Sequence, residues 1–174
     1  LHLALASLGI KKQDEVIVPN LTFISPINAA LYLNAKPVLV DIDKNNLCID
    51  PKKIEQAITK KTKAIIVVYL YGHACDINKI RKIAKKNKLL LIEDCAEAIG
   101  TYYNKKHVGN FGDASTFSFF GNKTITTGEG GMICFKNKKH FELARKLRDH
   151  GMNDDKRYWH DYVGFNYRMT NIQA

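Results

Sequence analysis

Lys123 stands in the segment of this sequence whose residue types most favour chemistry. It follows the aromatic run 119–120 and precedes a stretch of hydroxyls and glycines, residues 124–131. Glycine permits close approach of the backbone to a ligand. A lysine amine that is desolvated or lies beside another cation becomes a nucleophile and forms Schiff bases. Ser118, five residues earlier, could donate to a phosphate. The alternative is a solvated lysine in a turn, which the spacing alone favours.

Asp94 is the second candidate, because it follows the apolar run 89–92. A carboxylate at the end of a buried strand can pair with a cation such as a protonated heterocyclic nitrogen, and a low dielectric strengthens that pairing. The structural alternative is that Asp94 caps a helix over residues 95–98. Taken alone, the residues around Asp94 favour this alternative.

Strand and helix patterns alternate through the first two thirds of the chain and must position both candidates. The sequence predicts strands over residues 15–18, 37–40, 64–68, 89–92, 116–119 and 131–135. It predicts helices over residues 1–8, 25–34, 51–58, 77–86 and 141–150. A hairpin is expected over residues 101–109. The continuous β-branched run 64–68 is typical of a strand covered on both faces. Strands separated by helices predict a mostly parallel α/β sheet. Such sheets bind ligands at the carboxyl ends of their strands, which directs attention to residues 71–73, 93–94 and 118–123.

Composition excludes several other classes of protein. The chain has 174 residues, is 45% hydrophobic and 25% charged, and carries a formal net charge of +10. This is ordinary globular composition. The positive charge comes from lysine doublets spread along the chain, which are more typical of a solvated surface than of a nucleic-acid-binding stripe. No apolar run approaches the roughly 18 residues of a membrane-spanning helix, so no membrane partner is expected.

The four cysteines and the two chain ends give further expectations. Cys48, Cys75, Cys95 and Cys134 form no CxxC pair and no zinc-ligand spacing, so no metal site is expected, and unpaired cysteines suit the reducing cytoplasm. The sequence starts within an apolar helical pattern, and residues 170–174 are typical of a helix that is beginning. We therefore expect an excerpt of a longer chain.

Six short motifs follow one another along essentially the whole chain. They are residues 14–19 (DEVIVP), 35–38 (AKPV), 69–72 (YLYG), 92–98 (IEDCAEA), 109–113 (GNFGD) and 118–123 (SFFGNK). In these motifs the chain resembles the DegT/DnrJ/EryC1/StrS family of sugar aminotransferases, which are fold-type I pyridoxal-phosphate enzymes. The resemblance implies that residues 1–174 form the three-layer α/β/α large domain, with a mostly parallel sheet. The family places a further N-terminal segment before this region and a small C-terminal domain after it.

The resemblance also implies roles for individual residues around pyridoxal 5′-phosphate. Lys123 matches the lysine that bonds covalently to the cofactor and later moves protons. Asp94 matches the acid that pairs with the pyridinium nitrogen. Glu97 occupies a position beside the ring where the family often has glutamine. Ser118 matches a phosphate ligand, and Phe23 matches the aromatic residue that stacks on the ring.

Asn166 matches a residue that reaches the cofactor phosphate of the neighbouring subunit, which implies a homodimer with shared active sites. The implied substrates are glutamate and a nucleotide-linked 4-keto-6-deoxyhexose, with a GDP-linked sugar first. A UDP- or dTDP-linked sugar, or a C3 ketone, is the alternative within the same chemistry. A non-catalytic cofactor-binding regulator or scaffold is a different class of protein, and the presence of Lys123 argues against it.

Overall fold

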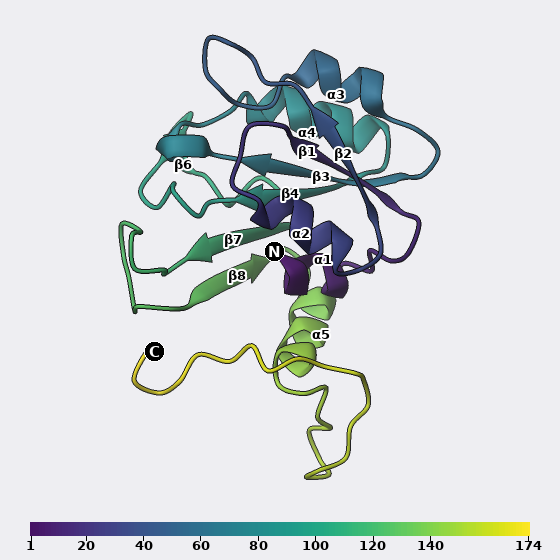
Figure 1. Ribbon diagram of the computed structural model, residues 1–174, viewed down its shortest axis with the longest axis vertical. Helices are drawn as coiled ribbons and strands as arrows, with labels where there is room; N and C mark the ends of the chain where they lie inside the picture. Colours follow the sequence, from purple (N-terminus) through teal and green to yellow (C-terminus); the bar gives the residue numbers. More distant parts are fainter.

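The computed structural model describes residues 1–174 and contains one six-stranded sheet (Figure 1). Its strands, in the spatial order β2-β1-β3-β4-β7-β8, are β2 (Lys36–Val40), β1 (Glu15–Pro19), β3 (Thr62–Val68), β4 (Leu90–Asp94), β7 (Ala114–Ser118) and β8 (Gly131–Phe135). All neighbouring pairs are parallel except β7 and β8. The predicted hairpin is the separate pair β5 (Tyr102–Tyr103) and β6 (Lys106–His107). The mostly parallel α/β sheet expected from the sequence is confirmed.

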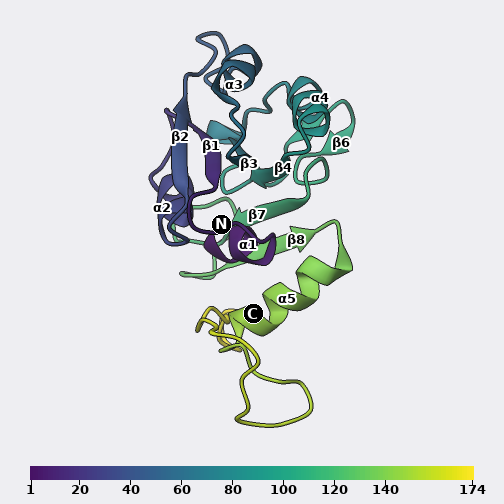
Figure 2. The same ribbon diagram turned by 90° about the vertical axis from the view of Figure 1, so that its right-hand side faces the viewer.

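Helices cover both faces of this sheet (Figure 2). The short helices α1 (His2–Ser7) and α2 (Ser25–Leu31) lie on one face, and α3 (Pro51–Ala57) and α4 (Ile77–Lys86) lie on the other. The helix α5 (Lys138–Arg148) packs against α1 and β8. The three layers α/β/α that the sequence predicts are therefore present.

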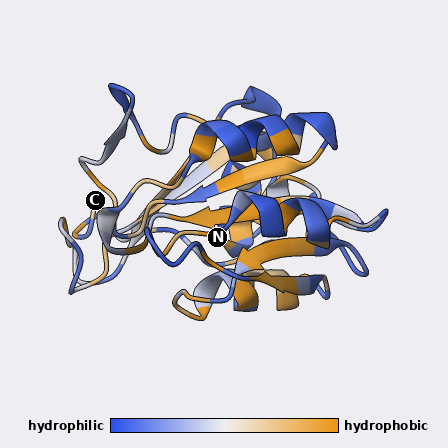
Figure 3. Ribbon diagram, turned by 90° about the horizontal axis from the view of Figure 1, so that it is seen from above, coloured by the Kyte–Doolittle hydropathy of each residue, from blue (hydrophilic) through white to orange (hydrophobic).

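Strand β3 shows how the sequence produces two cores. Its residues Ile65 and Val67 pack with the α3 and α4 side chains, whereas Ala64, Ile66 and Val68 pack with α1 and α2. Successive strand residues point to opposite faces, so a continuous apolar run fills both layers. Each fully buried Ile or Val contributes about 1.5–3 kcal/mol to folding. Figure 3 shows these hydrophobic strands between helices with hydrophilic outer parts.

Local signals fix several helix ends. The Asp50 carboxylate accepts a hydrogen bond from Lys52 N–H (2.8 Å), and Pro51 occupies the first helical position of α3. Gly9, with φ +84°, ends α1, since its N–H donates to Ala6 O and the next N–H donates to Leu5 O. This pair of bonds is the Schellman motif, which glycine adopts without strain.

The structure replaces one predicted helix by a turn and moves two predicted helix boundaries by three residues, whereas the other predicted boundaries agree to within two residues. The segment 95–98 is a turn and not a helix, because Cys95 N–H donates to Thr116 O (2.8 Å) and so extends the strand ladder. Helix α2 ends at Leu31, three residues early, and the chain then turns through Asn34 in the left-handed region (φ 55°). Helix α5 begins at Lys138, three residues early, because Asn137 caps it. None of the helices has the length and apolar character to cross a bilayer.

Candidate functional site

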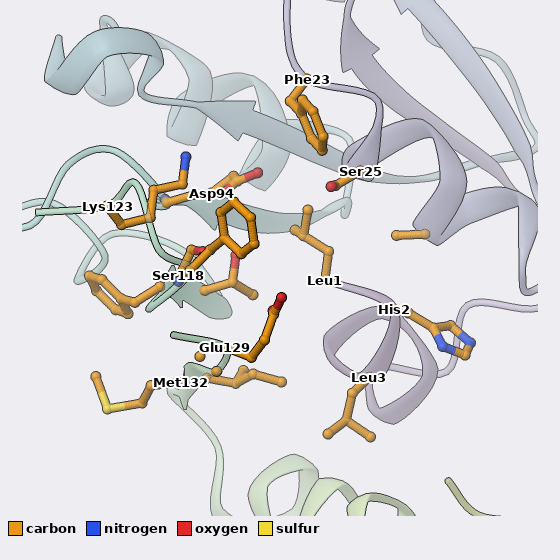
Figure 4. Close-up of a pocket in the computed structure, with 18 of the residues that line it drawn as sticks. Leu1, His2, Leu3, Phe23, Ser25, Asp94, Ser118, Lys123, Glu129 and Met132 are labelled. Atoms are coloured by element: carbon orange, nitrogen blue, oxygen red, sulfur yellow. Dashed lines mark hydrogen bonds between the residues drawn. The ribbon is translucent and has the colours of Figure 1, made fainter. Parts of the chain in front are cut away.

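A cavity of about 1010 Å³ opens at the carboxyl ends of the parallel strands, on the face covered by α1 and α2. All six residues singled out from the sequence line it: Phe23, Asp94, Glu97, Ser118, Lys123 and Asn166. In Figure 4, Asp94, Ser118 and Lys123 lie together on one side of the cavity, and Phe23 and Ser25 lie on the other. The cavity therefore lies at the edge of the sheet that the rule for ligand sites indicates, although residues 71–73 do not line it.

Asp94 is the last residue of β4 and is only 6% exposed. Its Oδ1 accepts a hydrogen bond from Ala96 N–H (3.1 Å), and no hydrogen bond reaches Oδ2. Burial raises the pKa of Asp94 above its ordinary value, although the hydrogen bond from Ala96 N–H and the nearby positive charge of Lys123 act the other way. A buried carboxylate with one open oxygen favours a cationic partner.

The turn between β7 and β8 holds Lys123. Thr127 N–H donates to Phe119 O (3.0 Å) and Lys123 N–H donates to Phe120 O (3.0 Å), so the turn is closed by its own backbone. The Lys123 side chain is only 19% exposed, and its Nζ lies 3.4 Å from Glu97 Oε1. The spacing favours a solvated lysine, and the structure shows that this prediction is wrong for Lys123. The amine is sheltered and has a carboxylate partner.

Ser118 and Phe23 lie at the other predicted positions. Ser118 ends β7, and its Oγ accepts a hydrogen bond from Phe120 N–H (3.3 Å), which leaves the hydroxyl hydrogen free to donate. Phe23 lies between β1 and α2 and is 75% exposed, although its ring lines the cavity. An aromatic face presented to a cavity in this way suits stacking against a planar ligand.

Asn166 reaches the cavity from the segment that follows α5, where it forms an isolated bridge with Asp149. It lines the cavity of its own chain. The role across a subunit boundary, which the family resemblance implies, stays a prediction.

Glu93 is an important residue whose role could not be predicted from the sequence. It is fully buried and lies on the opposite face of β4 from Asp94. Its carboxylate accepts four hydrogen bonds of 2.6–2.7 Å, from Tyr69 Oη–H and from the N–H groups of Gly109, Phe111 and Gly112. Four donors satisfy a buried carboxylate, so Glu93 ties the segment after β3 to the loop before β7, directly behind the cavity.

Two threonines on the cavity wall were also missed. The Oγ1 atoms of Thr22 and Thr116 are buried and have no hydrogen-bond partner in the protein. Leaving a buried hydroxyl unpaired costs about 1–3 kcal/mol, so these two atoms lower the stability of the cavity wall. Thr116 lies in β7, and threonine is common in strands for packing reasons, so its residue type alone carries no signal.

The mostly parallel sheet with helices on both faces is the α/β fold of the fold-type I pyridoxal-phosphate aminotransferases, and solved structures of such enzymes superpose on the chain. The sequence profile of the DegT/DnrJ/EryC1/StrS aminotransferase family matches residues 1–174, and the chain belongs to this family.

Known relatives are similar over the whole chain. The GDP-perosamine synthase of Escherichia coli O157:H7 is 54% identical over 174 residues, which are 100% of this chain and 48% of that protein. The UDP-N-acetyl-3-dehydro-alpha-D-glucosamine 3-aminotransferase of Acidithiobacillus ferrooxidans is 45% identical over 175 residues (100% and 47%). The crystal structure of NtdA from Bacillus subtilis with bound cofactor PMP superposes with a TM-score of 0.93 at 36% identity, covering 99% of this chain and 39% of that one. The chain spans about half the length of the curated relatives.

Proposed function

We propose that residues 1–174 are the cofactor-binding large domain of a pyridoxal-phosphate-dependent aminotransferase. Its substrate is a nucleotide-linked 4-keto-6-deoxyhexose, which it converts to the 4-amino sugar with glutamate as amino donor. The observation that carries this proposal is the convergence of Lys123 and Asp94, from different elements, on one cavity. The 54% identity to a GDP-perosamine synthase makes the GDP-linked sugar the first substrate to test.

The side chains of the cavity fit this cofactor. Lys123 offers a sheltered primary amine, and Asp94 offers a buried carboxylate for the ring nitrogen. Ser118 has a hydroxyl hydrogen free for the phosphate, and Phe23 presents an aromatic face. Aminotransferases of this family use pyridoxal phosphate, and the bound PMP of NtdA is the amino form of the same cofactor.

When bound, the cofactor withdraws electrons from the substrate carbon that exchanges its proton and nitrogen. Asp94 keeps the ring nitrogen protonated, which is the condition for that withdrawal. Lys123 is the general base and acid, and its Nζ removes the proton from the α-carbon of glutamate and later returns a proton to C4 of the sugar. Glu97, 3.4 Å away, holds the free amine inside the cavity between these transfers.

A homodimer completes the proposed site. Exposed aromatic side chains gather in the segment after α5, where Tyr158, Trp159 and Tyr162 are each about half exposed or more. Aromatic residues are enriched at the centres of interfaces, so this segment suits contact with a second copy. Asn166 lies in the same segment and would then serve the cofactor phosphate of the partner. All four cysteines are free, which suits a cytoplasmic enzyme.

The test uses the protein expressed from its full reading frame and loaded with pyridoxal phosphate. GDP-, UDP- and dTDP-linked keto sugars are incubated with glutamate, and formation of 2-oxoglutarate and of the amino sugar is followed, with Lys123→Ala as control. We expect turnover with a GDP-linked 4-keto sugar. Preference for a UDP-linked 3-ketone would point to the substrate class of the 45% identical relative. Cofactor binding without turnover on any sugar would contradict the proposal and favour the non-catalytic class.

A further inference from the structure

Arg168 lies on the wall of the cavity and has no role in the proposed function. Lys123 and Arg168 are the only lysine and arginine side chains that line the cavity. The other charged side chains on its wall are the carboxylates of Asp94, Glu97 and Glu129. Lys123 bonds to the cofactor in the proposed function. Arg168 is therefore the one permanent positive charge that remains for a further ligand.

Backbone hydrogen bonds fix the segment that carries Arg168 against the end of α5. Phe165 N–H donates to Leu147 O (2.6 Å), and Tyr167 N–H donates to Arg148 O (3.0 Å). Arg168 follows the second of these bonds directly along the chain. Its backbone is thus held at a defined place on the cavity wall.

The guanidinium of Arg168 is only partly bonded within the protein. Its Nη1 donates to Asp149 Oδ2 (3.0 Å), and no hydrogen bond is found at Nη2 or Nε. The side chain is 55% exposed and lines the cavity, so a ligand in the cavity can approach it. An exposed ion pair of this kind contributes little to stability. The pair with Asp149 orients the guanidinium and leaves most of its donors available.

Both proposed substrates carry oxyanions. Glutamate has two carboxylates, and the sugar nucleotide has a diphosphate. The acids on the cavity wall repel such groups, so a nearby cation is needed for them to bind. The planar fork of guanidinium N–H groups matches the oxygens of a carboxylate or a phosphate.

We propose that Arg168 binds an oxyanion of the substrate, either a carboxylate of the amino donor or the diphosphate of the sugar nucleotide. This inference rests on the proposed function, which supplies both substrates and assigns Lys123 to the cofactor. Arg168 then orients the substrate in the cavity and takes no part in proton transfer.

Binding of two unreactive probes tests this role. Glutarate has the two carboxylates of glutamate without its amine, and GDP has the diphosphate without the sugar. Each probe is titrated by calorimetry into the full-length protein loaded with pyridoxal phosphate. We expect Arg168→Gln to weaken one of the two by at least about tenfold, because a neutral amide loses the charge-assisted bond. Loss of glutarate affinity assigns the contact to the amino donor, and loss of GDP affinity assigns it to the sugar nucleotide.

Two controls separate this role from a structural one. Asp149→Asn breaks the ion pair but keeps the charge of Arg168, so neither probe should weaken by more than about threefold. Arg148→Gln removes a neighbouring arginine that does not line the cavity, and it should bind both probes like wild type. Should Arg168→Gln not fold, Arg168→Met keeps the apolar stem and is measured in the same way.

The proposal is overturned if Arg168→Gln binds both probes like wild type, or if all three variants weaken them equally. It is also overturned if the loaded wild-type protein binds neither probe. A wild-type protein that binds no pyridoxal phosphate overturns the proposed function instead. A wild-type protein that binds the cofactor and transfers the amine, with unchanged probe affinities in Arg168→Gln, overturns only the role of Arg168.

Discussion

The Nζ of Lys123 lies 3.4 Å from Oε1 of Glu97, while Oε2 of the same carboxylate accepts a 2.7 Å hydrogen bond from Tyr71 N–H. Tyr71 stands in the short turn after β3 and has a positive φ of 53°. Glu97 therefore joins that turn to the lysine that lies between β7 and β8. Because both oxygens are engaged, the carboxylate has one orientation, and the amine is held inside the cavity.

Lys123 should carry the cofactor covalently. Borohydride reduction of the loaded full-length protein, followed by peptide mapping, is expected to place the pyridoxyl group on Lys123, because this amine is sheltered and faces the cavity. Lys123→Arg keeps a positive charge next to Glu97 but cannot form the bond, so it should remain unlabelled. A label on a different lysine would remove Lys123 from the mechanism.

Asp94→Asn should slow the half-reaction with glutamate by a large factor, at least about 100-fold, because a neutral side chain no longer keeps the ring nitrogen protonated. Stopped-flow absorbance of the loaded enzyme measures this step directly. The fold should persist, since asparagine has nearly the same shape and still accepts from Ala96 N–H. Near wild-type rates would restore a purely structural role for Asp94.

The same substitution should stabilise the cofactor-free protein at neutral pH. Burial raises the pKa of Asp94 above its ordinary 3.8, so the folded chain binds this proton more tightly than the unfolded chain does. Ionisation of Asp94 therefore costs stability as the pH rises above 3.8. Urea unfolding over a pH series should show Asp94→Asn gaining on wild type through this range and matching it at lower pH.

Asp76→Asn serves as a control, because its expected change in stability at neutral pH has the opposite sign. Its hydrogen bond with Lys79 is the main cause that holds the pKa of the Asp76 carboxyl below its ordinary value. The stability that Asp76 contributes is present above that value and is lost as the pH falls. This variant should therefore be less stable than wild type at neutral pH. If both variants changed in the same direction, the electrostatic explanation would fail.

Substitutions around Glu93 should cost stability in a defined order. Tyr69→Phe removes one of four hydrogen bonds to the carboxylate and should lower the free energy of unfolding by about 1.5–3 kcal/mol. Glu93→Gln should cost more, because its amide N–H₂ faces backbone N–H donors and leaves at least one of them unpaired. Urea denaturation of the full-length protein measures both. The reverse order would contradict the four-donor arrangement.

Complementation tests the shared site. Full-length Lys123→Ala and Asn166→Ala proteins should each be inactive or severely impaired. When they are mixed and exchange subunits, partial activity should return, because one site in each mixed dimer has both residues intact. Asn166 lines the cavity of its own chain in the structure, so absence of activity in demonstrated mixed dimers would mean that each subunit builds its own site.

Regular elements were predictable wherever burial decides the pattern. The run 64–68 is apolar throughout because both of its faces are covered, and β3 is found there. Caps such as Asp50 were also predictable, since a side chain and its own helix decide them locally. The turn at 95–98 was not predictable in this way. Its first N–H is bonded to Thr116, twenty-one residues further along the chain, and no local pattern contains that partner.

The candidate site also contains residues that local sequence identifies and residues that only distant partners identify. Asp94 and Lys123 stood out because an acid after a buried strand and a lysine in a glycine-rich turn are unusual locally. Glu93 did not stand out. It is recognised by donors from two distant loops, and this property exists only in the folded chain.

Glu93 and Asp94 are consecutive acids whose side chains point to opposite faces of β4. Glu93 points toward its hydrogen-bond donors, and Asp94 points into the cavity. A slip of β4 by a single residue would exchange them, since side chains in a strand alternate. Such a slip would leave the three backbone N–H groups around Glu93 without their acceptor. Asp94 would be buried among them instead, in the wrong geometry. The four hydrogen bonds to Glu93 therefore favour the observed register of β4, and in that register Asp94 faces the cavity.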